Sequence, residues 1–181
     1  MENLFEPYFR RKRIEMVRRH ITPDSVVCDI GCGFDGTVLR GLRGHIRKGI
    51  GIDKKVSNKK FENIELRRIL VGGRLPKMEK SDYVLMLAVL EHLEKPEEIL
   101  IECRRILKKG GKILLTTPSP KSKYILEFLS ILRLVSPEEI RDHKHYFSPK
   151  ELHDLLLKCG FRNTYIKSFE AGLNTLAVAL K

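Results

Sequence analysis

The sequence has few cysteines and no long apolar run, and both absences narrow the range of functions. Its four cysteines form no CxxC pair, and no Cys/His cluster has the spacing of a zinc site. We therefore expect free, reduced thiols and no bound metal. The longest apolar run, Val84–Leu90, is far shorter than the ~20 residues that span a membrane. The N-terminal MENLFEPYFRRKR is followed by no apolar stretch, so we expect no secretory signal and a cytoplasmic location.

Acidic residues are scarce relative to basic ones. The chain has 35 Lys and Arg against 23 Asp and Glu, a formal net charge of +12 and a pI near 9.7. Such a surface favours anionic partners, including RNA or another polyanion. The basic residues occur mostly as doublets near the ends of predicted elements, however, which is typical of a solvated surface. RNA binding therefore stays an alternative.

The chain shows no internal repeat, low-complexity segment or linker, and 181 residues suit one domain with a single core. We expect residues 1–22 to hold a basic amphipathic helix, at about Leu4–His20, with Arg10–Arg13 facing solvent. Residues 25–181 would form the rest of the single domain.

Within residues 25–181, strand-like and helix-like runs alternate. The predicted strands are 25–30, 48–52, 64–71, 82–87, 112–117, 162–169 and 173–180, and the predicted helices are 36–42, 96–107, 122–135 and 148–159. The run Asp82–Leu87 is almost continuously apolar, as in a sheet buried on both faces. The short connection Glu170–Gly172 makes the last two strands antiparallel. The sequence predicts an α/β doubly wound sheet of seven strands, with an antiparallel last strand at the edge and helices on both faces.

The most informative stretch is Asp29–Gly36. Gly31, Gly33 and Gly36 follow a strand, open a helix and match G-x-G-x-x-G, whose glycines allow a sharp turn and close approach of a ligand. Asp53, at the end of the next strand, can accept hydrogen bonds from two ribose hydroxyls. Both features suit any adenosine-containing cofactor.

Asp29 favours one such cofactor over another. It lies two residues before Gly31, where its carboxylate would repel a pyrophosphate on the same helix N-terminus. A ligand carrying an ammonium and a sulfonium would instead be attracted, by a few kcal/mol per contact at ~4 Å and an effective dielectric of about 20, before desolvation. The acid therefore favours S-adenosylmethionine over NAD.

The segment V-C-D-I-G-C-G resembles the first motif of class I S-adenosylmethionine-dependent methyltransferases. Later segments resemble that family in the same order: Gly49–Asp53, Ser81–Leu93, Arg105–Pro118, Asp142–Ser148 and Cys159–Phe161. The resemblance implies a Rossmann-like fold and transfer of a methyl group from S-adenosylmethionine, leaving S-adenosylhomocysteine. It further implies that the acceptor is an oxygen or nitrogen of a small molecule, sugar or lipid precursor.

The resemblance also implies roles for individual residues. Its cofactor site would comprise Asp29, Gly31, Cys32, Gly33, Asp53, Lys54, Leu87, Ala88 and His92. Of these, Asp29 would meet the ammonium group, Asp53 the ribose and Lys54 the adenosine. His92, His143 and His145 are candidate general bases, each with an alternative reading as a structural or surface histidine.

Two departures from the family pattern keep alternatives open. The usual third glycine of the first motif falls at Asp35, with Gly36 one place later. No acid near Leu70–Gly72 is available to read the adenine amino group. A non-catalytic S-adenosylmethionine-binding module and an RNA methyltransferase are therefore alternatives, although no N/D-P-P-Y segment indicates an exocyclic-amine nucleic-acid methylase. An NAD-dependent reductase is disfavoured by Asp29 and by the absence of a separate catalytic domain.

Overall fold

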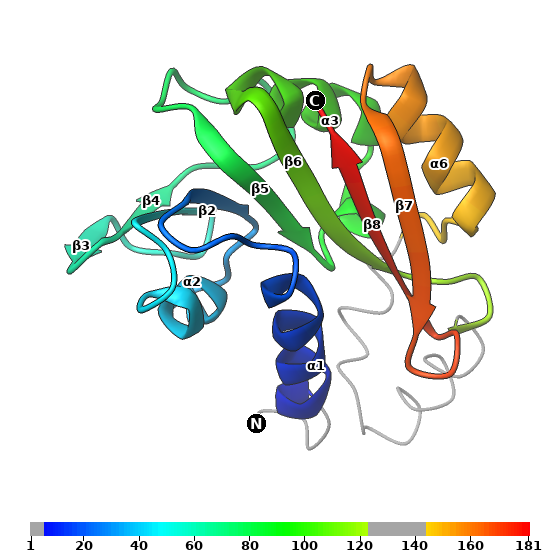
Figure 1. The fold of residues 1–181 in the computed structure, drawn as a ribbon, viewed down its shortest axis with the longest axis horizontal. Coiled ribbons are helices and arrows are strands. Elements are labelled where there is room, and N and C mark those ends of the chain that lie inside the picture. The colour runs from blue at the N-terminus through cyan, green and yellow to red at the C-terminus, as the bar shows by residue number, and fades with distance from the viewer. Residues whose placement is uncertain (1–5, 123–143) are drawn as a thin grey trace.

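The computed structural model describes residues 6–122 and 144–181. Its strands form one mixed sheet in the order β3-β4-β2-β1-β5-β6-β8-β7, with β3 and β7 at opposite ends (Figure 1). The strands are β1 (Val26–Ile30), β2 (Lys48–Asp53), β3 (Lys59–Phe61), β4 (Ile64–Arg68), β5 (Ser81–Leu87), β6 (Leu107–Pro118), β7 (Arg162–Phe169) and β8 (Asn174–Leu180). The helices are α1 (Glu6–Arg18), α2 (Thr37–Leu42), η1 (Leu90–His92), α3 (Pro96–Ile106) and α6 (Pro149–Lys158).

The order in which the chain adds strands to the sheet reverses at the central strand, β1. β1 pairs in parallel with β2 on one side and with β5 on the other. The chain first builds outward from β1 through β2 to β4, and then returns to add β5 and β6 on the opposite side. Ligands of open α/β sheets bind at the carboxyl ends of the strands at such a switch point. The fold thus directs attention to the loop that follows β1.

Helices cover both faces of the sheet, as predicted. On one face, buried side chains of α3 and α6, including Ile99 and Leu152, pack against Ile50 and Ile113 of the sheet. On the other face, Val17 of α1 and Leu39 of α2 belong to a second cluster with strand residues such as Leu85 and Leu114. Because β1 lies between these layers, all five of its residues are buried.

The turn from α3 into β6 differs from the prediction. The helix starts as expected, with Pro96 in its first turn followed by Glu97 and Glu98. It ends at Ile106, and β6 begins at once with Leu107 in an extended conformation. Gly110 does not stop the helix, since it lies within the strand at φ +78°.

The strand count of seven was too low, because β3 was missed. This short strand pairs antiparallel with β4 at the edge of the sheet. Its sequence, KKF, buries no side chain and carries no alternating apolar signal. The antiparallel last strand is confirmed, but β8 lies between β6 and β7, so the edge position predicted for it was wrong. The Rossmann-like α/β fold itself is confirmed.

The structure also bears on the cysteines, on metal ligands and on membrane-spanning helices. Among the described residues, the four cysteines are free and buried, and no group of His, Cys, Asp or Glu could hold a metal ion. In the same part of the chain, no helix is long and apolar enough to cross a membrane. The helix predicted at 122–135 lies, apart from its first residue, outside the described residues.

Candidate functional site

The loop after β1 turns sharply over the end of β2. Gly31 and Gly33 both have positive φ angles, +78° and +71°, which glycine adopts without strain. The N–H groups of Gly31 and Cys32 donate hydrogen bonds to the carbonyl of Ile52, at 2.7 and 3.1 Å. The loop is thereby fixed to the carboxyl end of the neighbouring strand.

Gly36 completes the turn that the displaced third glycine left in question. Its φ is +65°, and a Cβ atom there would lie 2.7 Å from Leu66 Cδ2. Asp35, in the usual glycine position, accepts hydrogen bonds from the backbone N–H and the hydroxyl of Thr37, at 3.2 and 2.6 Å. The carboxylate thus binds the first residue of α2, Thr37, and the altered motif still yields a tight loop-to-helix turn with Gly36 as the N-cap residue.

Asp53 holds the glycine loop from the end of β2. One of its carboxylate oxygens accepts a hydrogen bond from the N–H of Gly33 at 2.9 Å, and the other accepts one from the N–H of Lys55 at 2.7 Å. A carboxylate oxygen can accept about two hydrogen bonds, so both oxygens keep capacity for further donors. Asp53 therefore fixes the glycine loop, in addition to its predicted role toward the ribose.

Asp29 is a buried carboxylate with an unused acceptor. Its side chain is 1% exposed, and its Oδ2 has no hydrogen-bond partner among the described groups. Burial, and secondarily the charge of Asp53, raise the pKa of Asp29 to about 8. A buried carboxylate without a partner is costly, and a cation beside it would favour its ionised form.

The segment after β5 packs against the glycine loop. A Cβ atom on Gly31 would lie 2.3 Å from Val89 Cγ2, so Val89 and Gly31 are in close contact. Ala88 has a positive φ of +54° and donates its N–H to the carbonyl of Thr116 at 2.9 Å. The structure therefore brings Leu87 and Ala88, two predicted site residues, next to the predicted glycine loop.

Two of the three candidate histidines come from segments that meet. His92 lies in η1, and its N–H bonds to the carbonyl of Val89 at 3.1 Å. The N–H of His145 bonds to the carbonyl of Glu91, the residue before His92, at 3.2 Å. The ion pair between Lys144 Nζ and Glu94 Oε1, at 2.9 Å, holds the same two segments together. The third candidate, His143, lies outside the described residues.

Two apolar side chains at this edge of the sheet escaped the sequence reading. Phe34, in the glycine loop, is 62% exposed, and Leu70, just after β4, is 72% exposed. Large apolar side chains exposed in this way can mark a ligand surface. Their apolar character was visible in the sequence, but their exposure depends on the fold. Lys54 is also exposed, and its carbonyl accepts a hydrogen bond from Arg68 Nε at 3.2 Å.

These residues fit a cationic cofactor that carries a ribose. Asp29 offers a buried acceptor without a partner, and Asp53 keeps free acceptor capacity. At Gly33, an added Cβ would find no atom within 4 Å, so the loop borders open space. A buried carboxylate without a partner suits a cationic group, and a carboxylate with spare acceptor capacity suits hydroxyl donors.

Comparisons with known proteins decide the family. The sequence profile of a methyltransferase domain matches residues 3–166. The chain belongs to the class I S-adenosylmethionine-dependent methyltransferases. An uncharacterised protein of Methanocaldococcus jannaschii is 31% identical over 84% of this chain and 72% of its own length. The demethylmenaquinone methyltransferase of Tropheryma whipplei is 28% identical over 98% of this chain and 82% of its own.

A solved structure confirms the fold of this methyltransferase. An S-adenosylmethionine-dependent methyltransferase from Archaeoglobus fulgidus superposes with a TM-score of 0.67 at 22% identity, covering 98% of each chain. Membership of the family, shown by the profile match, gives S-adenosylmethionine as the cofactor.

Proposed function

We propose that this methyltransferase transfers the methyl group to an oxygen or nitrogen of a small molecule, such as a sugar or lipid precursor. The acceptor would lie over the carboxyl ends of β1 and β5, next to η1 and the segment Lys144–Phe147. The observation that carries this proposal is the backbone bond from His145 to Glu91, because it sets His145 beside the short helix that contains His92. The name of the T. whipplei relative supports a small, lipid-like acceptor, but not the choice of oxygen or nitrogen as the methylated atom, since menaquinone carries its added methyl group on a ring carbon.

The proposed site divides the work between the two carboxylates and the loops. Asp29 would bind the ammonium of the cofactor, and Asp53 would bind the ribose while it holds the glycine loop. Leu87 and Ala88 would border the methyl group. Gly31, Cys32 and Gly33 would lie against the methionine part, and Lys54 and Leu70 would border the adenosine.

Methyl transfer needs little further chemistry from the protein. S-adenosylmethionine supplies a methyl group that its sulfonium already activates for displacement. The residues of the site therefore mainly orient the acceptor and exclude water, which can contribute several kcal/mol. A protonated acceptor also needs a base, and the imidazole of His92 or His145 would take the proton from its hydroxyl or amine. The ring of Phe147 lies 5.5 Å, centroid to centroid, from that of His145 and would orient the His145 imidazole.

The proposal is tested by screening acceptors and then removing each imidazole. The purified enzyme is incubated with S-adenosylmethionine and with hydroxylated quinone precursors, sugars, amines or transfer RNA, and methylated products are identified by mass spectrometry. With an active small acceptor, either His92→Asn or His145→Asn should lower kcat by roughly 10²–10⁴-fold, the usual contribution of a general base.

The control for this experiment is His153→Asn, which alters a histidine of α6 away from the proposed site. This variant should retain full activity. Methylation of transfer RNA alone would overturn the small-molecule proposal. Full activity of both the His92 and His145 variants would overturn the roles of these histidines.

A further inference from the structure

A cavity lies at the amino ends of the strands, whereas the glycine loop lies at their carboxyl ends. The cavity encloses about 430 Å³. It is lined by Thr22, Pro23, Asp24, Ser25, Arg47, Asp82, Tyr83, Lys108, Lys109, Gly110, Gly111 and Lys112. These residues lie at or just before the starts of β2, β1, β5 and β6, which are neighbours in the sheet.

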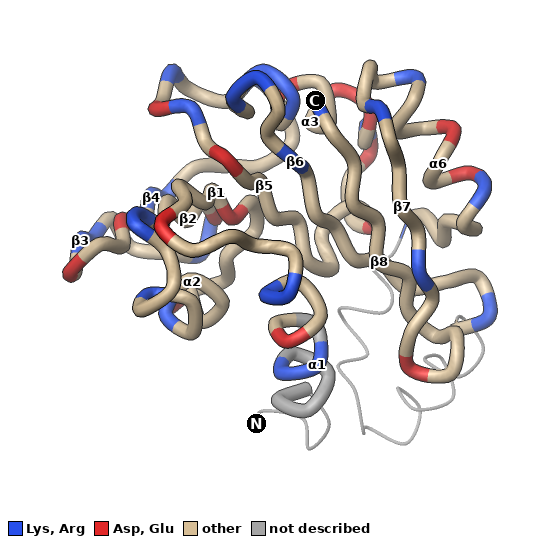
Figure 2. The backbone as a smooth tube through the Cα atoms, viewed as in Figure 1, with Lys and Arg blue, Asp and Glu red and all other residues tan. Residues whose placement is uncertain are grey.

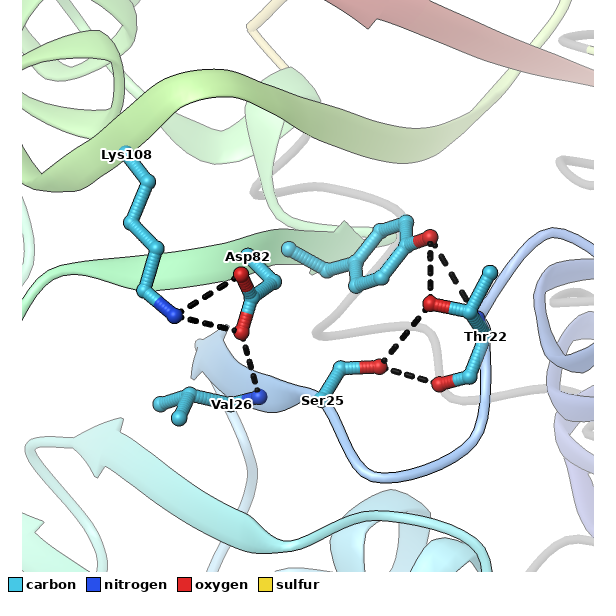
Figure 3. A network of polar contacts seen from close by, with 6 residues as sticks. Thr22, Ser25, Val26, Asp82 and Lys108 are labelled. Carbon is cyan, nitrogen blue, oxygen red and sulfur yellow. Dashed lines mark hydrogen bonds and ion pairs between the residues drawn. The ribbon is translucent and has the colours of Figure 1, made fainter.

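One side of this cavity is a set of fixed hydroxyl groups (Figure 3). The Tyr83 hydroxyl accepts a hydrogen bond from the N–H of Thr22 at 3.3 Å and lies 3.2 Å from the Thr22 hydroxyl. Ser25 Oγ lies 3.4 Å from the same Thr22 hydroxyl and donates to the Thr22 carbonyl. Tyr83 and Ser25 are only 6% and 4% exposed, so the network is held by the core.

The carboxylate of Asp82 is bound by one of the lysines that line the cavity. Both of its oxygens bind Lys108 Nζ at 2.8 Å, and one also accepts the N–H of Val26 at 2.8 Å (Figure 3). Burial alone would raise the pKa of Asp82, but these hydrogen bonds outweigh it and lower the pKa. Asp82 is thus paired with Lys108, and the charge of Arg47 lowers the pKa of Asp82 further.

The cavity keeps an excess of positive charge. Arg47, Lys109 and Lys112 are exposed and form no ion pair with any carboxylate in the described part of the chain. After the Asp82–Lys108 pair, Asp24 is the one acidic residue in the lining that faces these three cations. In Figure 2, the blue segments at the start of β6 are its lysines.

The charge of Lys112 affects a histidine beside the cavity. The pKa of His20 is lowered by burial and then by the charges of Lys112 and Lys167. A further cation is therefore unfavourable near Lys112, and an anion would be favoured there.

We propose that this cavity binds a phosphate group, either of an RNA backbone or of a free phosphorylated molecule. Cationic side chains around hydroxyl groups provide the charge-assisted hydrogen bonds that phosphate oxygens accept. The five residues of β1, at about 3.3 Å each, separate the cavity from the glycine loop by roughly 15 Å. The phosphate therefore occupies a site distinct from the cofactor site, and both can be filled at once.

The test compares two probes on one pair of matched variants. Binding of a short fluorescein-labelled oligouridylate is followed by anisotropy, and binding of inorganic pyrophosphate is followed by calorimetry. The pocket variant combines Arg47→Gln, Lys109→Gln and Lys112→Gln. The control variant combines Lys59→Gln, Lys60→Gln and Lys121→Gln, which removes the same charge from exposed positions elsewhere.

The pocket variant should bind the responsive probe at least roughly tenfold more weakly, whereas the control should bind like the wild type. If RNA is the source, the slope of log affinity against log salt should also fall by about 0.7 for each lost phosphate contact. If the pocket variant loses affinity for pyrophosphate but the wild type does not bind the oligouridylate more tightly than pyrophosphate, the ligand is a free phosphorylated molecule.

Equal losses in the pocket and control variants would overturn the proposal, because they would reflect the overall charge. The proposal would be overturned as well if neither probe bound. Binding of S-adenosylmethionine is measured on both variants and should not change, which shows that each variant is folded.

Discussion

Asp29, the residue before the end of β1, and Asp53, the last residue of β2, lie beside one glycine loop, and their negative charges repel each other. Burial is the first reason that the pKa of Asp29 rises to about 8, and the charge of Asp53 is the second. Asp53 offsets its own charge with two backbone N–H donors, whereas Asp29 Oδ2 has no partner among the described groups. A bound cofactor should therefore change the ionisation of Asp29, whereas it should add hydrogen bonds to Asp53.

The raised pKa of Asp29 predicts that the ligand-free protein loses stability as pH rises. The folded protein holds this proton up to about pH 8, whereas an unfolded Asp releases it near pH 3.8. Between these values the folded state binds more protons, so the free energy of unfolding should fall with pH by up to about 1.4 kcal/mol per unit. Urea unfolding of wild type and Asp29→Asn between pH 5 and pH 8 measures this difference. Parallel pH profiles for the two proteins would contradict the assignment.

The same carboxylate predicts proton release when the cofactor binds. A cation beside Asp29 favours the ionised form, so binding of S-adenosylmethionine at pH 7 should lower the pKa of Asp29 and expel a proton. Calorimetric titrations in buffers of different ionisation enthalpy count the released protons. Asp29→Asn should release none from this site and should bind more weakly. Equal proton counts for wild type and variant would show that Asp29 stays protonated in the complex.

Asp53 should influence cofactor affinity through both the loop and the ribose. Asp53→Ala removes the acceptors for the N–H groups of Gly33 and Lys55, and with them the proposed acceptors for the ribose hydroxyls. We expect the affinity for S-adenosylhomocysteine to fall by about 1–3 kcal/mol. Calorimetry gives this value, with the exposed Glu62→Ala as the control. An unchanged affinity of Asp53→Ala would refute the proposed ribose contact.

Ser148 should contribute to stability as a helix cap. Its hydroxyl accepts the N–H of Glu151 at 3.2 Å, and the Glu151 carboxylate accepts the N–H of Ser148 at 2.8 Å, which completes the capping box at the start of α6. Ser148→Ala should therefore reduce the free energy of unfolding by about 1 kcal/mol. Urea unfolding measures the loss. The exposed Lys150→Ala, which removes only a surface ion pair, should change it by less.

This cap illustrates which parts of the fold are readable in the sequence. Ser148, Pro149 and Glu151 act on their immediate neighbours, so their spacing alone predicts the start of α6. The apolar run of β5 likewise predicts a buried strand. The strand Lys59–Phe61 lacked any such signal, because its pairing with β4 depends on a contact between main chains.

The site divides in the same way. The glycines of the loop and the two aspartates follow a local pattern, and the structure brings them together as that pattern suggests. The bonds from Asp53 to the N–H groups of Gly33 and Lys55 depend on how β2 aligns with β1, which the sequence does not show. The contact of His145 with Glu91 joins segments far apart in the chain, and the exposure of Leu70 depends on its surroundings.

Gly31 and Gly33 should respond differently to the same substitution. Both have positive φ, so alanine costs roughly 1–2 kcal/mol of backbone strain at either position. At Gly31 the added methyl would also meet Val89 Cγ2 at 2.3 Å, whereas at Gly33 it would point into open space. Gly31→Ala should therefore reduce the free energy of unfolding more than Gly33→Ala does, and adding Val89→Ala should recover part of that loss.

Cofactor binding should separate the two glycines further. If the open space at Gly33 receives the methionine part of the cofactor, Gly33→Ala should weaken S-adenosylmethionine binding by more than its loss of stability accounts for. The double variant Gly31→Ala/Val89→Ala relieves the clash behind the loop without adding an atom in front of it. Calorimetry on both variants decides this point. Wild-type affinity in Gly33→Ala would place the cofactor elsewhere along the loop.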